Sequence, residues 1–288
     1  MIDPFSRILV CERKEPLKSF SRAQEALTKA EAAEVAAFNV YGPKDRRFLE
    51  RLLDLADAQQ TAKEYGRSLE SGIALDRYAK ETGFISLRLE NFYMIIQNEL
   101  AQRNIIEADE ISTAVMKEMR NSIAGQWSVY WRLKLLSLHA DIFQEKGQLA
   151  LEMNTRMEAF TAFSKELGET LYETMLLRLY LGECRERCRV WEEALGDYET
   201  VYATFQLQGL FSSAEEKVSL LARRYRCLVH LGDGQRALET RIWILNSIKR
   251  SFAPGSVQRL QILSFLKNSR REAAGDSSSE RDEKSNRL

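Results

Sequence analysis

Apolar residues recur at intervals of three and four along almost the whole chain, with polar and charged residues between them. This spacing places the apolar side chains on one face of a helix, so it predicts a succession of amphipathic helices. Strand-like alternation occurs only at residues 7–11, a stretch too short to build a sheet. The pattern therefore predicts an all-α protein.

Capping residues, glycine and proline mark the expected helix ends. Ser21 and Ser213 are each followed three residues later by Gln or Glu, the spacing of a capping box. Pro43 indicates a helix that opens near residue 44 and closes at Gly66, and Thr170 is expected to cap another. The expected helices span residues 22–40, 44–65, 69–82, 86–104, 108–123, 127–146, 149–167, 171–187, 191–207, 214–231, 235–252 and 256–272.

Alternate helices begin near residues 44, 85, 127, 170 and 214, which is a period of about 41 to 44 residues. Such a period is typical of helical repeat arrays, in which each unit is a helix, a tight turn and a second helix. One hairpin cannot bury its apolar face alone, so neighbouring hairpins must stack. We therefore expect an α-solenoid of about five stacked antiparallel helix hairpins, with helices 22–40 and 256–272 as caps.

This periodicity also predicts how the chain is divided. Residues 1–20 form an N-terminal extension, and residues 21–272 form the helical repeat domain. Residues 273–288 are polar and charged without apolar anchors, so this tail is expected to be disordered.

The segment LYLGECRERCRVWEEALGDYETVYATF, residues 179–205, carries the most specific pattern. Gly182 lies before a polar turn, and Ala194 and Tyr198 follow it at helical spacing. Near the turn of an antiparallel hairpin, small side chains let the two backbones approach. This pattern resembles the tetratricopeptide repeat (TPR) family, which has a small residue at its eighth position, alanine at its twentieth and an aromatic residue at its twenty-fourth.

Weaker matches to the family lie on both sides of this segment. They fall at Leu136, Ala140, Phe143 and Gly147, and at Gly232 and Ala237. The departures from the family pattern are Arg178 and Arg185 at apolar places, Tyr225 at a small place and Glu152 at an alanine place. The period also exceeds the family's usual 34 residues, so the resemblance is to a divergent TPR-like repeat with longer helices.

The resemblance implies a binding surface, because in this family the first helix of each hairpin lines the concave face. Carried over by register, that face has mixed charged and apolar side chains, which suit a peptide or helix of another protein. It lacks the run of lysines and arginines that would clamp a terminal carboxylate. Its expected members are Lys134, Ser137, Asp141, Glu145, Leu176, Leu179, Glu183, Glu186, Arg187, Ala222, Arg226, Val229 and His230.

Charge and composition narrow the function further. The 42 lysines and arginines balance 42 aspartates and glutamates, which argues against nucleic-acid binding by bulk charge. No stretch approaches the roughly 18 apolar residues of a membrane span, and the N-terminal apolar run is too short for a signal peptide. With only 4 cysteines, the chain is expected to be soluble and intracellular, in the cytoplasm or also the nucleus.

A zinc site is the strongest metal candidate, because Cys184, Cys188, Cys227 and His230 offer four suitable ligands. However, the repeat register places Cys184 and Cys227 at the same position of successive hairpins. Packed helix axes lie about 8–10 Å apart, whereas zinc ligands lie about 2.3 Å from one ion. We therefore expect free thiols, and neither a metal nor a cofactor.

No pattern of catalytic residues accompanies the repeats. The chain has 2 histidines, and it contains no glycine-rich phosphate loop, G-x-S-x-G or H-E-x-x-H segment. We expect a non-catalytic protein-interaction scaffold, acting as an adaptor or a subunit of a larger complex, with a protein partner and no small-molecule substrate. An RNA-binding repeat protein and an all-α enzyme with a site between helices stay open as alternatives.

Overall fold

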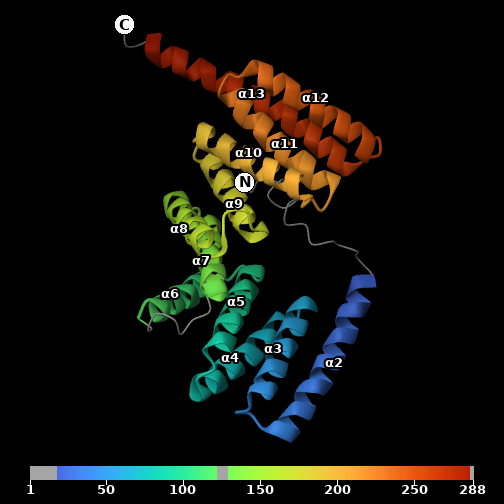
Figure 1. Ribbon diagram of the computed structural model, residues 1–288, viewed down its shortest axis with the longest axis vertical. Coiled ribbons are helices and arrows are strands. Elements are labelled where there is room, and N and C mark those ends of the chain that lie inside the picture. The colour runs from blue at the N-terminus through green and yellow to red at the C-terminus, as the bar shows by residue number, and fades with distance from the viewer. Residues whose placement is uncertain (1–17, 122–128, 286–288) are drawn as a thin grey trace. The chain divides into compact units, whose positions relative to one another are not determined.

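The computed structural model describes residues 18–121 and 129–285, and within these ranges every regular element is a helix (Figure 1). This confirms the all-α prediction. The helices are α2 (Lys18–Tyr41), α3 (Arg46–Thr61), α4 (Tyr65–Thr82), α5 (Ile85–Ala101), α6 (Ile105–Asn121), α7 (Val129–Glu145), α8 (Leu149–Leu167), α9 (Tyr172–Arg187), α10 (Trp191–Gln208), α11 (Ala214–His230), α12 (Gly234–Ser251) and α13 (Val257–Ser285).

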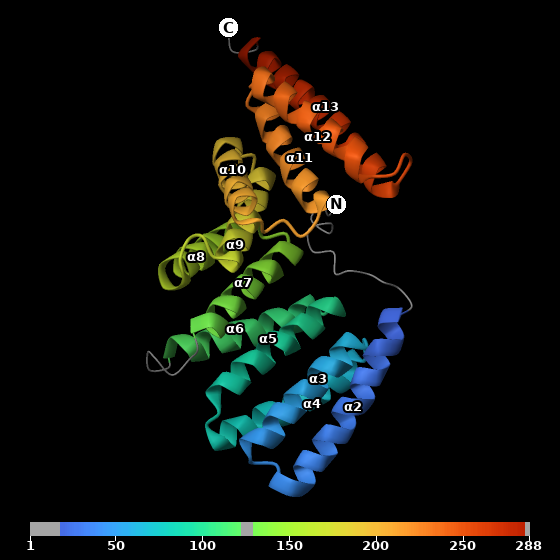
Figure 2. The same cartoon turned by 45° about the vertical axis from the view of Figure 1, so that its right-hand side comes forward.

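The chain forms two compact units that divide at the end of α8. We call α2–α8 the N-terminal unit and α9–α13 the C-terminal unit; both are seen from a second side in Figure 2. Within the units, sequence neighbours pack against each other in the pairs α2–α3, α3–α4, α4–α5, α5–α6 and α6–α7, and in α9–α10, α10–α11 and α11–α12. In the N-terminal unit α5 contacts α3 and α4, and α7 contacts α5 and α6. In the C-terminal unit α11 contacts α10, and α13 contacts α11.

The turn inside each hairpin has the same backbone conformation. Its central residue has a left-handed φ of 61 to 75°, and these residues recur every 40 to 44 positions, at Lys63, Arg103, Gly147, Arg189 and Gly232. In each turn the following N–H donates to the carbonyl five residues earlier at 2.8–3.0 Å. This is the Schellman arrangement that closes a helix. The left-handed turns therefore recur with the same period of about 40 to 44 residues that the sequence predicts for the hairpins.

Several predicted helix ends differ from the observed ones. The helix expected to close at Gly66 ends at Thr61, because Lys63 makes the left-handed turn and Gly66 belongs to α4. Ser21 does not cap a helix, since α2 already begins at Lys18. Leu171, and not Thr170, is the N-cap of α9. Ser213 does cap α11, accepting from the Glu216 N–H at 3.1 Å.

The last helix is longer than expected. The sequence predicts an end at residue 272 and a disordered tail, whereas α13 continues to Ser285. Residues 273–285 contain no proline that would end the helix.

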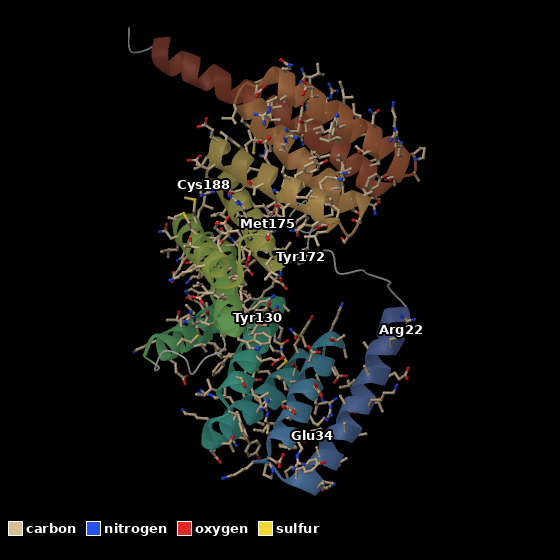
Figure 3. The ribbon with its side chains drawn as sticks, in the orientation of Figure 1. Arg22, Glu34, Tyr130, Tyr172, Met175 and Cys188 are labelled. Carbon is tan, nitrogen blue, oxygen red and sulfur yellow. The ribbon has the colours of Figure 1, made fainter. Side chains whose placement is uncertain are left out.

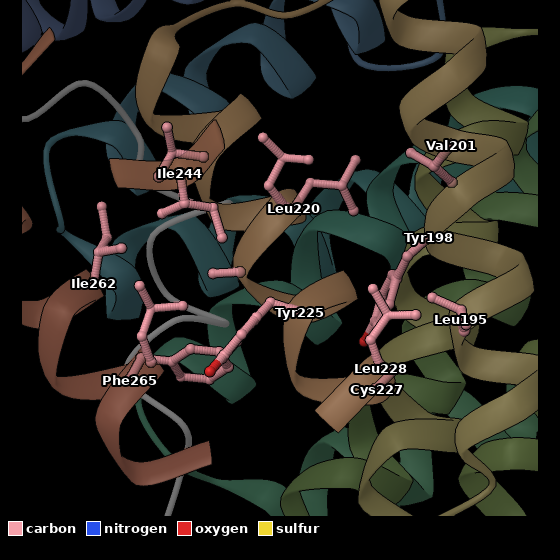
Figure 4. Packing of buried hydrophobic residues seen from close by; sticks show 14 of the residues in the cluster. Leu195, Tyr198, Val201, Leu220, Tyr225, Cys227, Leu228, Ile244, Ile262 and Phe265 are labelled. Carbon is pink, nitrogen blue, oxygen red and sulfur yellow. The ribbon is translucent and has the colours of Figure 1, made fainter. Parts of the chain in front are cut away.

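The core of the C-terminal unit is one cluster drawn from all its helices (Figure 4). Tyr198 and Phe205 of α10 are fully buried in it, and Ile262 and Phe265 of α13 cover its far end. The N-terminal unit has two clusters, one over α2–α5 and one over α5–α7. The stack thus buries apolar faces that a lone hairpin would leave in water.

Candidate protein-interaction surface

In the N-terminal unit, the predicted partner-binding residues all lie on α7. Lys134 is half-buried with its ammonium 5.3 Å from the ring centre of Tyr130, which is labelled in Figure 3. Asp141 forms an ion pair with Arg156 of α8 at 2.9 Å. Glu145, in the last turn, is exposed. Lys134 and Glu145 are thus accessible, and Asp141 has an intramolecular partner.

In the C-terminal unit, the predicted residues lie on α9 and α11. Arg187 is exposed, and Leu176 and Val229 are half-buried where they pack on the core cluster. Leu179 is 2% exposed and Glu183 is 8% exposed. A partner could reach neither of these last two side chains without a local rearrangement, so both act in packing in the free protein.

A buried ionic network joins α9, α10, α11 and α13. Its centre is Glu186, whose carboxylate accepts from the Tyr198 hydroxyl at 2.6 Å. The same carboxylate pairs with Arg226 at 3.0 Å and with Arg223 at 3.3 Å. Arg223 also pairs with Glu183 at 3.0 Å. Because removal of one partner from a buried ion pair leaves an uncompensated charge, this network fixes the register between the helices.

The network orients the accessible end of α11. Arg226 lies between Glu186 and Glu272 of α13, with 2.8 Å to the latter. One turn later the His230 ring stacks on Trp191 of α10, with ring centres 3.9 Å apart and planes 3° from parallel. Both side chains are half-buried. The Arg226 guanidinium is engaged by two carboxylates and its Nε is buried, and the His230 Nε2 is buried as well. These two side chains therefore present fixed, half-buried faces at the end of α11 rather than open donors.

The two arginines at apolar family places have a common partner. Arg178 and Arg185 of α9 donate to the buried carboxylate of Asp197 on α10, at 3.2 Å and 2.6 Å. Asp197 is 3% exposed. Two arginines on one carboxylate give a charge-assisted link between the helices of the hairpin, which replaces an apolar contact.

The cysteines of the C-terminal unit are free, with Cys184 and Cys227 buried and Cys188, labelled in Figure 3, half-buried. Burial raises the pKa of the Cys227 thiol, with the Glu186 carboxylate adding to the effect, so it stays protonated. In the described parts of the chain no group of three or more His, Cys, Asp or Glu side chains could hold a metal ion. Cys11 lies outside the described residues.

The sequence did not reveal three side chains that hold the predicted residues in place. They are Trp191, which stacks on His230, Tyr198, whose hydroxyl donates to Glu186, and Glu272, which pairs with Arg226. The aromatic character of Tyr198 was noted, but its hydroxyl bond to Glu186 depends on a partner in the preceding helix. Glu272 is 46 residues from Arg226, so no local pattern connects them.

Comparison with solved structures shows which fold the helical stack has. No protein-family model and no curated protein matches the chain. Among solved structures, BtubC (BKLC) from P. vanneervenii has a TM-score of 0.63 at 14% identity, over 83% of this chain and 94% of that chain. Two structures of a putative kinesin light chain of Podosopora anserina with nearly identical TPR-like repeats, one of them a substituted variant, have TM-scores of 0.53 and 0.52 at 16% and 17% identity. They cover 66% and 65% of this chain and 90% of each of those chains. The chain has a TPR-like helical-repeat fold.

The TPR-like fold confirms the α-solenoid prediction. Ala56, Ile96, Ala140, Gly182 and Tyr225 occupy the place of the family's first small residue, and all are buried. Proteins with this fold commonly mediate protein interactions. None of the helices in the described parts has the length and apolarity needed to cross a membrane.

Proposed function

We propose that this protein is a non-catalytic interaction scaffold, an adaptor or a subunit of a multiprotein complex, which binds a peptide or helix of a protein partner. Each unit has its own candidate contact surface on the first helices of its hairpins: α7 in the N-terminal unit, and α9 and α11 in the C-terminal unit. Lys134, Glu145, Leu176, Arg187, Arg226, Val229 and His230 make the contacts. The reason is that rigid side chains at a surface lose little conformational freedom on binding.

The observation that carries this proposal is the fixed orientation of Arg226 and His230. Arg226 is held by Glu186 and Glu272, and His230 by the Trp191 ring. Arginine and aromatic side chains contribute most to protein interfaces when they are held in well-packed surroundings. The buried network therefore supports a recognition role for the surface above it.

An affinity purification with two charge reversals tests the proposal. The full chain captures partners from an extract of its source, and the captured protein is purified and its affinity measured. We expect Lys134→Glu together with Arg187→Glu to weaken that affinity at least about tenfold, since both side chains are accessible. The matched control reverses Arg77 and Lys80 of α4, which are exposed on a second helix of a hairpin.

The control should leave the affinity within about twofold of the unaltered chain. Equal weakening by both pairs would show that the first helices are not the binding surface. Absence of any saturable protein partner, with turnover of a substrate by the purified chain, would contradict the scaffold role itself.

A further inference from the structure

A groove runs between α12 and α13 in the C-terminal unit. Its volume is about 400 Å³, and it is lined by Arg241 and Leu245 of α12 and by Leu263, Leu266, Lys267, Arg270 and Arg271 of α13. No residue in this lining was among those expected from sequence to contact a partner. The groove has an apolar floor of three leucines and a rim of four cationic side chains.

The apolar floor continues along both helices. Ile242 is 48% exposed and lies one turn before Leu245 on α12, and Leu238 is 56% exposed and lies two turns before it. On α13, Leu260 precedes Leu263 by one turn and is 57% exposed. The opposite face of each helix is buried, through Ile244 and Ile248 on α12. Each helix thus carries a second apolar stripe that no described helix covers.

The four cations of the rim have no acidic partner among the side chains that the structure describes. Elsewhere in this unit arginines are neutralised: Asp197 accepts from Arg178 and Arg185, Glu186 from Arg223 and Arg226, and Glu199 from Arg224 and Arg236. The excess of positive charge is therefore a local property of the groove. The chain as a whole has zero net charge.

Tyr225 lies on α11 at the position that Gly182 occupies on α9, seven residues before the left-handed residue of the turn. In the other hairpins this position holds alanine, isoleucine or glycine, and in the fourth hairpin Gly182 lets Tyr198 pack within contact distance. In the last hairpin the buried ring of Tyr225 already occupies this space. Arg241, at the place equivalent to Tyr198, lines the groove with Arg270.

We infer that the groove between α12 and α13 binds an acidic amphipathic helix of a partner protein. This rests on the proposed function, since it assumes a protein partner, and it names the chemistry of that partner. Apolar side chains at i, i+3, i+4 and i+7 of the bound helix lie on Leu245, Leu263 and the exposed Leu260. Glutamates or aspartates on its flanks pair with the four cations of the rim.

A helix fits this groove better than other anions do. A free phosphate would use the cations and leave the leucines in water. A nucleic-acid backbone would also pair with the cations, but it has no apolar stripe for the exposed isoleucine and leucines. An apolar stripe on each helix with cations along the rim is the kind of surface that helix-in-groove recognition uses.

Fluorescence anisotropy with the full chain tests this inference. The probe is a labelled synthetic peptide of about 18 residues, enough to span α12, with leucines at i, i+3, i+4 and i+7 and glutamates on both flanks. The groove variants are Arg241→Glu with Arg270→Glu, and Leu263→Ser. The control, Arg77→Glu with Lys80→Glu, makes the same change in net charge at exposed positions of α4, in the other unit.

We expect saturable binding that each groove variant weakens at least about tenfold and that the control leaves within about twofold. A scrambled peptide of the same composition should also bind at least about tenfold more weakly, because its leucines no longer share a face. Circular dichroism and thermal unfolding of each variant establish that it is folded.

Three results would overturn the inference. The first is no saturable binding of the probe at concentrations up to about 1 mM. The second is an unchanged affinity in Leu263→Ser together with equal binding of a single-stranded RNA of the same charge, which would make the groove a nucleic-acid site. The third is self-association in sedimentation that the groove variants abolish, which would make a second copy the occupant. If a captured partner still depends on Lys134 and Arg187 while the probe fails, the scaffold proposal stands and this inference falls.

Discussion

Gly182 and Tyr198 show how single residues set the spacing of a hairpin. A methyl group on Gly182 would lie 3.0 Å from the Tyr198 ring and 3.1 Å from the Asp197 side chain. Neither neighbour can move easily, because Tyr198 is fully buried and bonded to Glu186, and Asp197 holds two arginines. Position 182 therefore requires glycine, because Tyr198 and Asp197 leave no room for a larger side chain.

Substitution of two glycines in the same hairpin should have opposite effects on stability. Gly182→Ala should lower the free energy of unfolding by about 1–3 kcal/mol through overpacking. Gly196→Ala should raise it by about 0.5–1 kcal/mol, since Gly196 is in a helix interior with nothing within 4 Å of the added methyl group. Urea unfolding measures both, and equal effects of the two substitutions would contradict the close approach.

The Tyr198 hydroxyl should contribute measurably to the buried network. Burial, together with the Glu186 carboxylate, raises the pKa of Tyr198, so the hydroxyl keeps the proton that it donates. Tyr198→Phe should cost about 1.5–3 kcal/mol of unfolding free energy, because a charged acceptor loses a donor in the core. Tyr202→Phe, a half-buried tyrosine on the same helix, is the control and should change stability by less than about 0.5 kcal/mol.

At the scale of helices, the N-terminus of α3 shows how a capping side chain contributes to stability. Asp45 is the N-cap residue, and its carboxylate accepts from the side chain and the backbone N–H of Arg47. These bonds favour the ionised form and lower the pKa of Asp45 to about 2 from the ordinary 3.8. The contribution of this cap to stability is thus present above pH 3.8 and is lost as the pH falls towards 2.

NMR titration of the carboxyl carbon should place the Asp45 pKa clearly below 3.8. Arg47→Ala should bring it back towards that value, since the Arg47 side chain is the largest cause of the shift. Because the pair is exposed, added salt should also reduce the shift. A pKa that Arg47→Ala leaves unchanged would show that the side-chain bond does not form in solution.

Most helices could be predicted from sequence, and their ends less well. Apolar spacing alone is enough to place twelve helices, since it reflects which face is buried. The turns at Lys63 and Arg103 were placed three or four residues too late, because a left-handed conformation usually favours glycine, whereas the break at Arg189 was predicted. In these turns the three backbone bonds of the Schellman arrangement offset the cost of the side chain.

The candidate surface was less predictable than the fold. Register placed residues on α7, α9 and α11, but it could not show that Leu179 and Glu183 are buried. Burial depends on which helix packs against each face, and the ionic network joins residues up to 46 positions apart. The groove between α12 and α13 depends in the same way on a contact between helices.

At the scale of the whole molecule, the account predicts that each unit needs its end helix. α13 covers the core of the C-terminal unit through Ile262, Phe265 and Leu266. A chain ending at residue 255 should therefore lose on the order of 5 kcal/mol of stability in this unit, from three apolar side chains at about 1.5–3 kcal/mol each. It should also bind a dye for exposed apolar surface.

A chain ending at residue 274 is the control for this truncation. It retains the three core residues and Glu272, so its unfolding midpoint should match that of the full chain. Equal stability of both truncated chains would show that α13 is not part of the stack.

The most direct test of the scaffold proposal is hydrogen exchange of the full chain with and without its purified partner. We predict slower exchange in peptides from α7, α9 and α11, with further protection of α12 and α13 if the partner contains an acidic helix, and little change in α4, α6 and α8. Protection confined to the second helices of the hairpins, or no protection at saturating partner, would contradict the account.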